Sequence, residues 1–292
     1  MPDSPRMTIT AALATALLLG GCVGNRNWNP FPEASAPVLH PDATAEQVVA
    51  QLNSNIAKCT AWRCTDVTVK SNQIPISASA MMAVESPRRF RMLVSAMQID
   101  LADLGSNDER MWIWMRPPAD EPSYIYTCSH TDLGAAQQRT ALPFRPDWLM
   151  EVLGVMPIDP AEVEMTQNPG DAGEFLLRSE QQTADGSPVV RIMTVDAKQG
   201  VVVNHALWNG TTGELIAQAK LGEHRRDEKT GVLLPHEIQL SYPSADASMT
   251  LSIKNIEVNP VSLAENTWMP SGAANCPCVD LASGQVVTLD RQ

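Results

Sequence analysis

The sequence predicts a mainly β protein with few helices, built as an unclosed antiparallel β-barrel, or half-barrel, with a helix as its lid or plug. Two observations lead to this fold class. From Thr65 onwards, apolar residues recur at every second position in runs separated by Gly, Pro, Asn and Asp, which is typical of an antiparallel meander. Several of these strands are apolar on both faces, so both faces of the sheet need cover. A strongly curved sheet filled by apolar helices meets that need.

Residues 1–21 have the character of a signal peptide. Residues 11–22 read AALATALLLGGC, an apolar run as long as a signal-peptide core and too short to span a bilayer. Leu19, Gly20, Gly21 and Cys22 resemble the lipobox of bacterial lipoproteins, in which small residues let a peptidase cut before a lipidated cysteine. We therefore expect Cys22 to carry diacylglyceryl and fatty-acyl groups such as palmitate. The alternative is an ordinary secretory signal with a chance cysteine, and a start at Met7 would leave Cys22 unchanged.

The rest of the chain divides into three predicted parts. Residues 22–42, rich in Pro and Asn, are expected to form a tether behind the lipidated cysteine. Residues 43–270 are expected to form one half-barrel domain, and residues 271–292 a C-terminal tail. The net charge of -12 argues against nucleic acid as a partner and against a basic patch on anionic lipids. Contact with a membrane is therefore expected through the lipid on Cys22, since each buried acyl methylene contributes roughly 0.8 kcal/mol.

The first predicted element is an amphipathic helix over residues 44–58. Thr44 and Gln47 have the spacing of a capping box. Val48, Leu52 and Ile56 follow at four-residue intervals, so the helix has one face to bury.

Two predicted meanders follow, separated by a short helix. Residues 145–154 form that helix, with Asp147 as its cap, a nearly all-apolar body and Gly154 as its stop. Such a helix must be covered, which suits a plug inside the sheet. The alternation slips by one residue near Lys254, which predicts a bulge. The expected strands are residues 65–72, 74–85, 88–98, 108–116 and 122–130 in the first meander, and 173–183, 188–196, 200–208, 213–225, 232–242 and 246–258 in the second.

Besides Cys22, the chain has Cys59, Cys64, Cys128, Cys276 and Cys278. An odd number of thiols in an oxidising compartment predicts a free thiol or an intermolecular bond. Cys59 and Cys64 could close a short loop through a disulfide, whereas Cys276 and Cys278 are too close in sequence to pair without strain. We expect the tail to be held by a disulfide or to lie along the sheet. A metal site among these cysteines is disfavoured because no histidine lies beside them at ligand spacing.

The methionines of the strands suggest an acyl cavity. The chain has 14 Met but only four Phe, and the flexible thioether can adapt to acyl chains of varied shape. The alternative is that methionine simply fills an irregular core. The residues expected to line the cavity are Met92, Val94, Met111, Ile113, Met115, Trp148, Leu149, Leu153 and Met249.

The order of these parts, together with four motifs, resembles the lipoprotein-localisation superfamily, to which LolA and LolB belong. The motifs are residues 84–91 (VESPRRFR), 103–114 (DLGSNDERMWIW), 234–243 (LPHEIQLSYP) and 256–259 (IEVN). This resemblance implies an unclosed barrel with a helical lid that binds acyl chains. In the membrane-bound type it also implies that lipoproteins are received from a soluble carrier and inserted into the outer membrane.

The resemblance also implies roles for particular residues. The membrane-bound type projects an apolar loop towards the bilayer, and Ile99, Leu101 and Leu104 lie in the matching region. Arg89 and Arg91 are the nearest candidates for the arginine that closes the lid of the carrier. The alternative for both arginines is a solvent-facing strand edge.

The hypothesis from the sequence is a monomeric, lipid-anchored protein on the periplasmic side of the outer membrane. It would bind acyl chains or lipoproteins, in lipoprotein sorting or outer-membrane maintenance, without a cofactor. The chain has no nucleophile elbow, phosphate loop or metalloprotease helix, so we do not expect an enzyme. One alternative is a structural or sensory lipoprotein that contacts another envelope protein, and another is a redox protein that uses Cys276 and Cys278.

Overall fold

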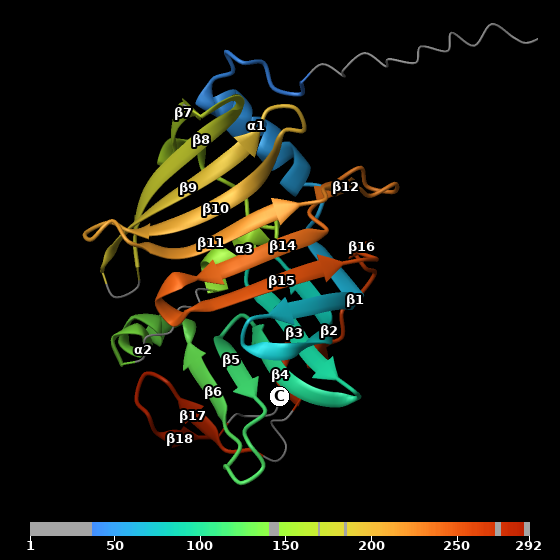
Figure 1. Cartoon of the computed structure of the whole chain (residues 1–292), viewed down its shortest axis with the longest axis vertical. Helices are drawn as coiled ribbons and strands as arrows, with labels where there is room; N and C mark the ends of the chain where they lie inside the picture. Colours follow the sequence, from blue (N-terminus) through green and yellow to red (C-terminus); the bar gives the residue numbers. More distant parts are fainter. Residues whose placement is uncertain (1–36, 140–145, 169, 184–185, 272–275, 289–292) are drawn as a thin grey trace, which may run out of the picture. The chain divides into compact units, whose positions relative to one another are not determined.

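One sheet of 16 strands organises the chain in the computed structural model, which describes residues 37–139, 146–168, 170–183, 186–271 and 276–288 (Figure 1). These residues belong to one compact unit, Pro37–Gln292. The signal peptide, Cys22 and most of the tether lie outside the described residues.

The first wing of the sheet is a meander in which each strand pairs with the next. Its strands are β1 (Ala61–Ser71), β2 (Ile74–Glu85), β3 (Arg89–Ala96), β4 (Ile99–Ser106), β5 (Arg110–Met115) and β6 (Ile125–Ser129). β4 was not expected, because Asp100 and Asp103 interrupt its apolar alternation. The expected strand 88–98 ends early at a tight hairpin, where Met97 and Gln98 have φ of 50° and 64°.

The second wing is also a meander, and it includes the open edge of the sheet. Its strands are β7 (Glu164–Asn168), β8 (Asp171–Gln182), β9 (Pro188–Asp196), β10 (Val201–Asn209), β11 (Leu215–Gly222), β14 (Glu237–Tyr242) and β15 (Ala247–Ile253). β7 was not predicted. Between β11 and β14, β12 (Arg225–Arg226) and β13 (Leu233–Leu234) form a separate ribbon. The bulge expected near Lys254 is instead a break: β1 pairs with β15 up to Ile253 and with β16 (Glu257–Val258) in the same register.

The two wings join where β1 pairs with β15, and the sheet does not close. β7 ends one edge, and the C-terminal tail supplies the other. There β17 (Cys278–Asp280) pairs in parallel with β6, and β18 (Val286–Val287) pairs antiparallel with β17. The mainly β, unclosed half-barrel is therefore confirmed, with the correction that one strand pair is parallel. The tail lies along the sheet, which is one of the two arrangements predicted from the sequence.

Three helices cover the inner face, the face that packs on the central core. α1 (Ala45–Ile56) begins at the predicted capping box, in which Gln47 N donates to Thr44 Oγ1 at 3.4 Å and Thr44 N to Gln47 Oε1 at 2.9 Å. It packs on β8 and β9 through Val48, Val49 and Leu52. α2 (Leu133–Arg139), which was not predicted, covers Met111 and Cys128.

α3 (Pro146–Val152) is the plug that the sequence predicts. Trp148, Leu149, Val152 and Leu153 pack in one cluster with buried residues from both wings, such as Val94 of β3, Leu207 of β10 and Leu251 of β15. Since the two wings meet around one short helix, the sheet curves about α3 (Figure 1).

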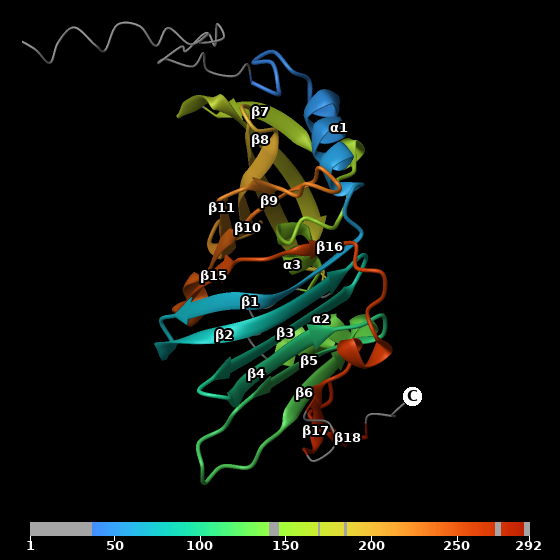
Figure 2. The same cartoon turned by 90° about the vertical axis from the view of Figure 1, so that its right-hand side faces the viewer.

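The outer face of the first wing is covered by residues 259–271, which we call the C-terminal strap. In Figure 2 the red chain that follows β16 descends beside this wing to β17. Asp103, buried on β4, accepts hydrogen bonds from Arg91 (2.9 Å), from Trp112 Nε1 (3.1 Å) and from Ser271 Oγ (2.6 Å). Arg91 also donates to the carbonyl of Thr267. The tryptophan face of β5 thus receives the cover that a two-faced strand requires.

Candidate functional site

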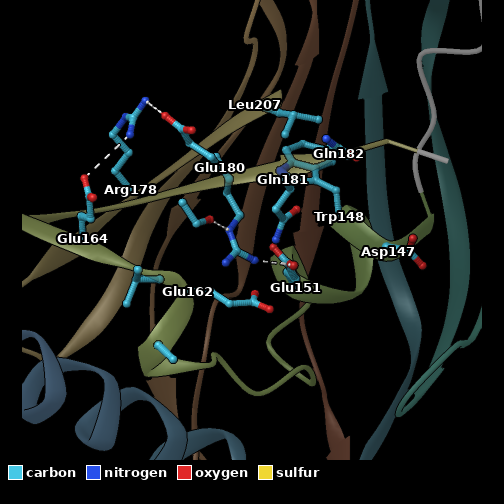
Figure 3. Close-up of a pocket in the computed structure, with 14 residues that line it drawn as sticks. Asp147, Trp148, Glu151, Glu162, Glu164, Arg178, Glu180, Gln181, Gln182 and Leu207 are labelled. Carbon is cyan, nitrogen blue, oxygen red and sulfur yellow. Dashed lines mark hydrogen bonds and ion pairs between the residues drawn. The ribbon is translucent and has the colours of Figure 1, made fainter. Parts of the chain in front are cut away.

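A hollow of about 790 Å³ lies between α3 and the end of β8 (Figure 3). That volume is in the range of small-molecule and cofactor sites. The hollow extends along β8 from Arg178 to Gln182 and along the approach to β7. Its lining residues are Asp147, Trp148, Glu151, Ala161, Glu162, Val163, Glu164, Arg178, Ser179, Glu180, Gln181, Gln182, Arg191 and Leu207.

The apolar wall of the hollow is built around Trp148. Its ring packs edge-on against Tyr242 at 6.2 Å between centroids, and Leu207 and Val163 complete the wall. The side chain of Trp148 is buried, yet its indole N–H has no acceptor among the residues that the structure describes. An N–H in that position has lost water without gaining a partner, which costs free energy.

A buried ion pair links the plug helix to the sheet beside this wall. Arg191 Nη1 of β9 lies 2.5 Å from Glu151 Oε1 of α3, and Arg191 Nε donates to Ser179 Oγ of β8 at 2.9 Å. The side chains of Arg191 and Glu151 are 6% and 21% exposed. Paired charges of this kind hold their partners strongly, because separating them leaves a charge with little water around it.

The rest of the lining is acidic. Five carboxylates face two guanidinium groups in the hollow. Arg178 is already paired, with Glu180 at 2.6 Å and with Glu164 at 3.8 Å (Figure 3). Asp147 and Glu162 form no ion pair within the described part of the chain. The hollow therefore favours a ligand that brings a positive charge to an apolar wall.

A smaller cavity of about 60 Å³ lies on the other side of Glu151. It is mostly apolar, with Leu52 of α1, Met193 of β9 and Leu221 of β11 in its walls. His205 also faces it. Burial lowers the pKa of His205 to about 3, and the charge of Arg191 acts in the same direction. The imidazole is therefore neutral at physiological pH, which leaves the apolar character of this cavity intact.

Most of the residues predicted to line an acyl cavity lie in the packed core instead of in the hollow. Met92, Val94, Trp148, Leu149 and Leu153 are buried in the cluster around α3, with Met249 at its margin, and of these only Trp148 lines the hollow. The strand register confirms that Met111, Ile113 and Met115 share this inner face. However, Met111 and Ile113 pack beneath α2, and Met115 is 64% exposed. Whether any of them touches an acyl chain stays a prediction.

The predicted membrane-contact residues differ in exposure. Ile99 is 49% exposed at the start of β4, whereas Leu101 and Leu104 pack partly buried against the central core. The most exposed apolar residue beside them is Met97, at 83%, in the hairpin turn. Met97 was not among the membrane-contact residues predicted from the sequence.

The two arginines considered for lid closure lie on the outer part of the sheet and bind the strap. Arg91 pairs with Asp103, as described above. Arg89 pairs with Asp108 at 2.6 Å and with Glu265 at 3.5 Å. The arginine that contacts a helix of the inner face is Arg191. It could not be singled out in the sequence, because its partners on α3 and β8 are distant along the chain and only the strand pairing places them together.

The cysteines of the described residues are all free. The disulfide considered between Cys59 and Cys64 is not formed: Cys59 Sγ contacts the carbonyl of Ala61 at 3.5 Å, and Cys64 Sγ accepts from Asp66 N at 3.4 Å. Burial raises the pKa of Cys59 to about 12 and that of Cys128 to about 11, and it also raises the pKa of Cys278. Thiols in such surroundings are poor nucleophiles at neutral pH.

In the described residues, no group of three His, Cys, Asp or Glu side chains is placed to hold a metal ion. No helix in that part of the chain is both long and apolar enough to cross a bilayer.

No family model and no curated protein matches the sequence. Solved structures that are similar include a DUF1329 family protein from Desulfovibrio piger, with 10% identity over 77% of this chain and 95% of that chain and a TM-score of 0.49. A putative outer membrane lipoprotein-sorting protein domain from Vibrio parahaemolyticus has 11% identity over 77% and 97%, with a TM-score of 0.49. A LolA superfamily protein from Nitrosomonas europaea has 9% identity over 78% and 98%, with a TM-score of 0.45.

Each of these TM-scores is under 0.5. One of these similar structures is a LolA superfamily protein, and LolA belongs to the superfamily that the sequence motifs resemble.

Proposed function

We propose that this chain is a lipid-anchored protein of the cell envelope that binds acyl chains or acylated proteins in the hollow beside α3. The observation that carries the proposal is the hollow itself: about 790 Å³ of space between a plug helix and the sheet, with Trp148 and Leu207 in its wall. In this proposal the acyl chain packs against that wall, and the polar part of the ligand meets the carboxylates. The protein would bind and position its acylated ligand, without forming or breaking covalent bonds and without a cofactor.

The anchor belongs to the same proposal. Lipidated Cys22 would hold the protein at the periplasmic face of the outer membrane, as a monomer that receives or retains acylated ligands there. The exposed side chains of Met97 and Ile99 add a second apolar contact at the tip of the β3–β4 hairpin. The acyl groups on Cys22 would anchor the protein stably, and a second, linked contact would fix its orientation on the membrane. Lipoprotein sorting or maintenance of the outer membrane is the role that suits this arrangement.

The proposal is tested by occluding the hollow. Gln181→Trp places a large ring into it from β8, and Gln239→Trp makes the same change at an exposed position of β14 outside the hollow. A fluorescent palmitoylated peptide is expected to bind the parent protein and Gln239→Trp alike. It should bind Gln181→Trp roughly tenfold more weakly, a loss of about 1.4 kcal/mol.

Native mass spectrometry of the purified mature protein gives an independent readout. Acyl-bearing molecules are expected to co-purify with the parent protein and to be depleted in Gln181→Trp. The proposal would be refuted if the protein carries no non-covalently bound lipid, and if the parent protein, Gln181→Trp and Gln239→Trp all bind the palmitoylated peptide equally. Specific capture of an envelope protein, unaffected by that peptide, would favour the structural or sensory role instead.

A further inference from the structure

The last four residues of β8 form a strand edge without a neighbour in the described part of the chain. β7 pairs with β8 only from Glu164 opposite Arg178 to Asn168 opposite Asp171. Among the described residues, 179–182 therefore have β9 on one side and no strand on the other. An open edge of this kind is a template for another extended chain.

The hydrogen-bonding groups that face this edge follow from the hairpin beside it. Thr183 donates its N–H to the carbonyl of Ser187 at 2.9 Å, so Thr183 faces β9. Successive residues of an antiparallel strand face opposite neighbours in turn. Glu180 and Gln182 therefore direct their N–H and C=O groups to the open side. Pro188, which lies opposite Gln182, agrees with this because it has no N–H to donate.

The open edge lies inside the hollow. Residues 179–182 all line it, and α3 forms the opposite wall. A strand added at the usual spacing of about 4.8 Å from β8 would run through this space. It would pass Trp148, which forms the apolar wall of this space.

The charge of the lining selects the kind of chain that fits. Asp147 and Glu162 lack ion-pair partners in the described residues, while both guanidinium groups of the hollow are already paired. Lysine or arginine side chains on an added strand would meet these carboxylates. An acidic strand would meet like charge in a partly buried space, which is unfavourable.

We propose that the hollow binds an extended, lysine- or arginine-bearing peptide as an additional strand beside residues 179–182 of β8. The inference rests on the proposed function: the peptide is the polypeptide that follows the acylated end of a lipoprotein, while the acyl chain packs on the wall of Trp148. Main-chain pairing tolerates many sequences, and the carboxylates set the preference for basic ones.

The edge is tested with a proline that removes one outward N–H. Proline is tolerated on an edge strand where its nitrogen faces away from the neighbouring strand, so Gln182→Pro should leave the pairing of β8 with β9 intact. The matched control is Gln167→Pro on β7. By the same alternation the nitrogen of Gln167 faces the outer edge of that strand, and Gln167 does not line the hollow.

The probe is a fluorescent synthetic peptide that alternates lysine with valine and serine and carries no acyl group. Fluorescence anisotropy is expected to show binding to the parent protein and to Gln167→Pro, and about tenfold weaker binding to Gln182→Pro. A glutamate version of the peptide should bind much more weakly than the lysine version. If Gln182→Pro does not fold, a lysine peptide N-methylated at alternate residues replaces it, and the methylated peptide should not bind.

Three outcomes overturn the proposal. In the first, Gln182→Pro binds as well as the parent protein does. In the second, Gln167→Pro loses binding to the same extent. In the third, the N-methylated peptide binds as well as the unmodified one. Failure here is separable from failure of the proposed function. A palmitoylated peptide that still binds Gln182→Pro fully leaves acyl binding standing and removes the added strand. If the unacylated peptide binds and the palmitoylated peptide binds no more tightly, the added strand stands and acyl binding in the hollow is refuted.

Discussion

Arg191 connects the two structural parts that surround the candidate site. Its guanidinium group binds Glu151 of the plug helix and Ser179 of β8, and all three residues line the hollow. A long, buried cation at this position costs desolvation energy that a methionine would not. Its contribution therefore depends on both contacts being made together, and a change at either partner should weaken the attachment of α3.

Replacing the guanidinium should destabilise the protein far more than replacing an exposed one. Arg191→Met removes the buried ion pair with Glu151 and the hydrogen bond to Ser179, so we expect the free energy of unfolding to fall by roughly 3 kcal/mol. Arg63, which pairs with Glu257 at 2.6 Å with both side chains about half exposed, is the control. Arg63→Met should cost under about 1 kcal/mol. Urea unfolding measures both, and equal losses would contradict the role given to Arg191. The double variant Arg191→Met with Glu151→Leu should recover most of the loss.

The β3–β4 hairpin combines strain with exposed apolar surface. Met97 and Gln98 both have positive φ, a conformation that costs most residues other than Gly about 1 kcal/mol or more each. Asn followed by Gly is the pair that such a turn favours. A sequence chosen for stability alone would therefore differ from Met97-Gln98, and the exposure of Met97 agrees with a contact made by this hairpin.

Changing the turn to its favoured pair should raise stability and weaken membrane contact together. Met97→Asn with Gln98→Gly is expected to increase the free energy of unfolding by about 1 kcal/mol, since the positive φ values are then less strained. It should also reduce co-sedimentation with phosphatidylethanolamine–phosphatidylglycerol vesicles. Val261→Asn, which removes a fully exposed apolar side chain from the strap, controls for the loss of apolar surface. Unchanged vesicle binding in the turn variant would remove the hairpin from the proposed function.

The elements that the sequence predicts well are those whose apolar residues follow one period. α1 is found because Thr44 and Gln47 cap a run of four-residue spacing, and α3 because Trp148 to Leu153 are almost all apolar. β4 is missed because Asp103 occupies a buried position. That aspartate is satisfied by Arg91, Trp112 and Ser271, which only the folded chain brings together. The candidate site divides in the same way: Trp148 is predicted from its helix, whereas Arg191 and the open edge of β8 depend on long-range strand pairing.

The whole unit is stabilised from two sides of one sheet. On the inner face, both wings pack around α3, the second wing also packs against α1, and His205 is buried there. On the outer face, the C-terminal strap is held by Asp103. Burial of Asp103 would raise its pKa, but the hydrogen bonds from Arg91 and Ser271 outweigh it and hold the pKa below its usual value. Both faces therefore contain a group whose protonation disfavours the folded state, and acid should weaken the protein in two pH windows that overlap below about pH 3.9.

His205 contributes to the window between about pH 6.5 and pH 3. Its pKa is about 3 in the folded state, chiefly because of burial, and about 6.5 in an unfolded chain. The unfolded chain therefore binds more protons in this range, so stability is full above about pH 6.5 and falls with acidification by up to about 1.4 kcal/mol per pH unit. The contribution of Asp103, whose folded pKa is lowered, is lost only as the pH falls below about 3.9.

Substitution of His205 should remove its contribution to the first window and leave the second. His224, whose pKa is also lowered by burial, keeps its own contribution. Arg191, Glu151 and His224 also face this region, and all three remain in His205→Met. Because His205 Nδ1 has no hydrogen-bond partner among the described residues, the substitution should cost little at pH 7 and flatten the loss of stability between pH 7 and pH 5. His40→Met, at an exposed histidine, should keep the slope of the parent protein. Urea unfolding at several pH values measures the slopes, and a parent-like slope in His205→Met would assign the acid sensitivity to another group.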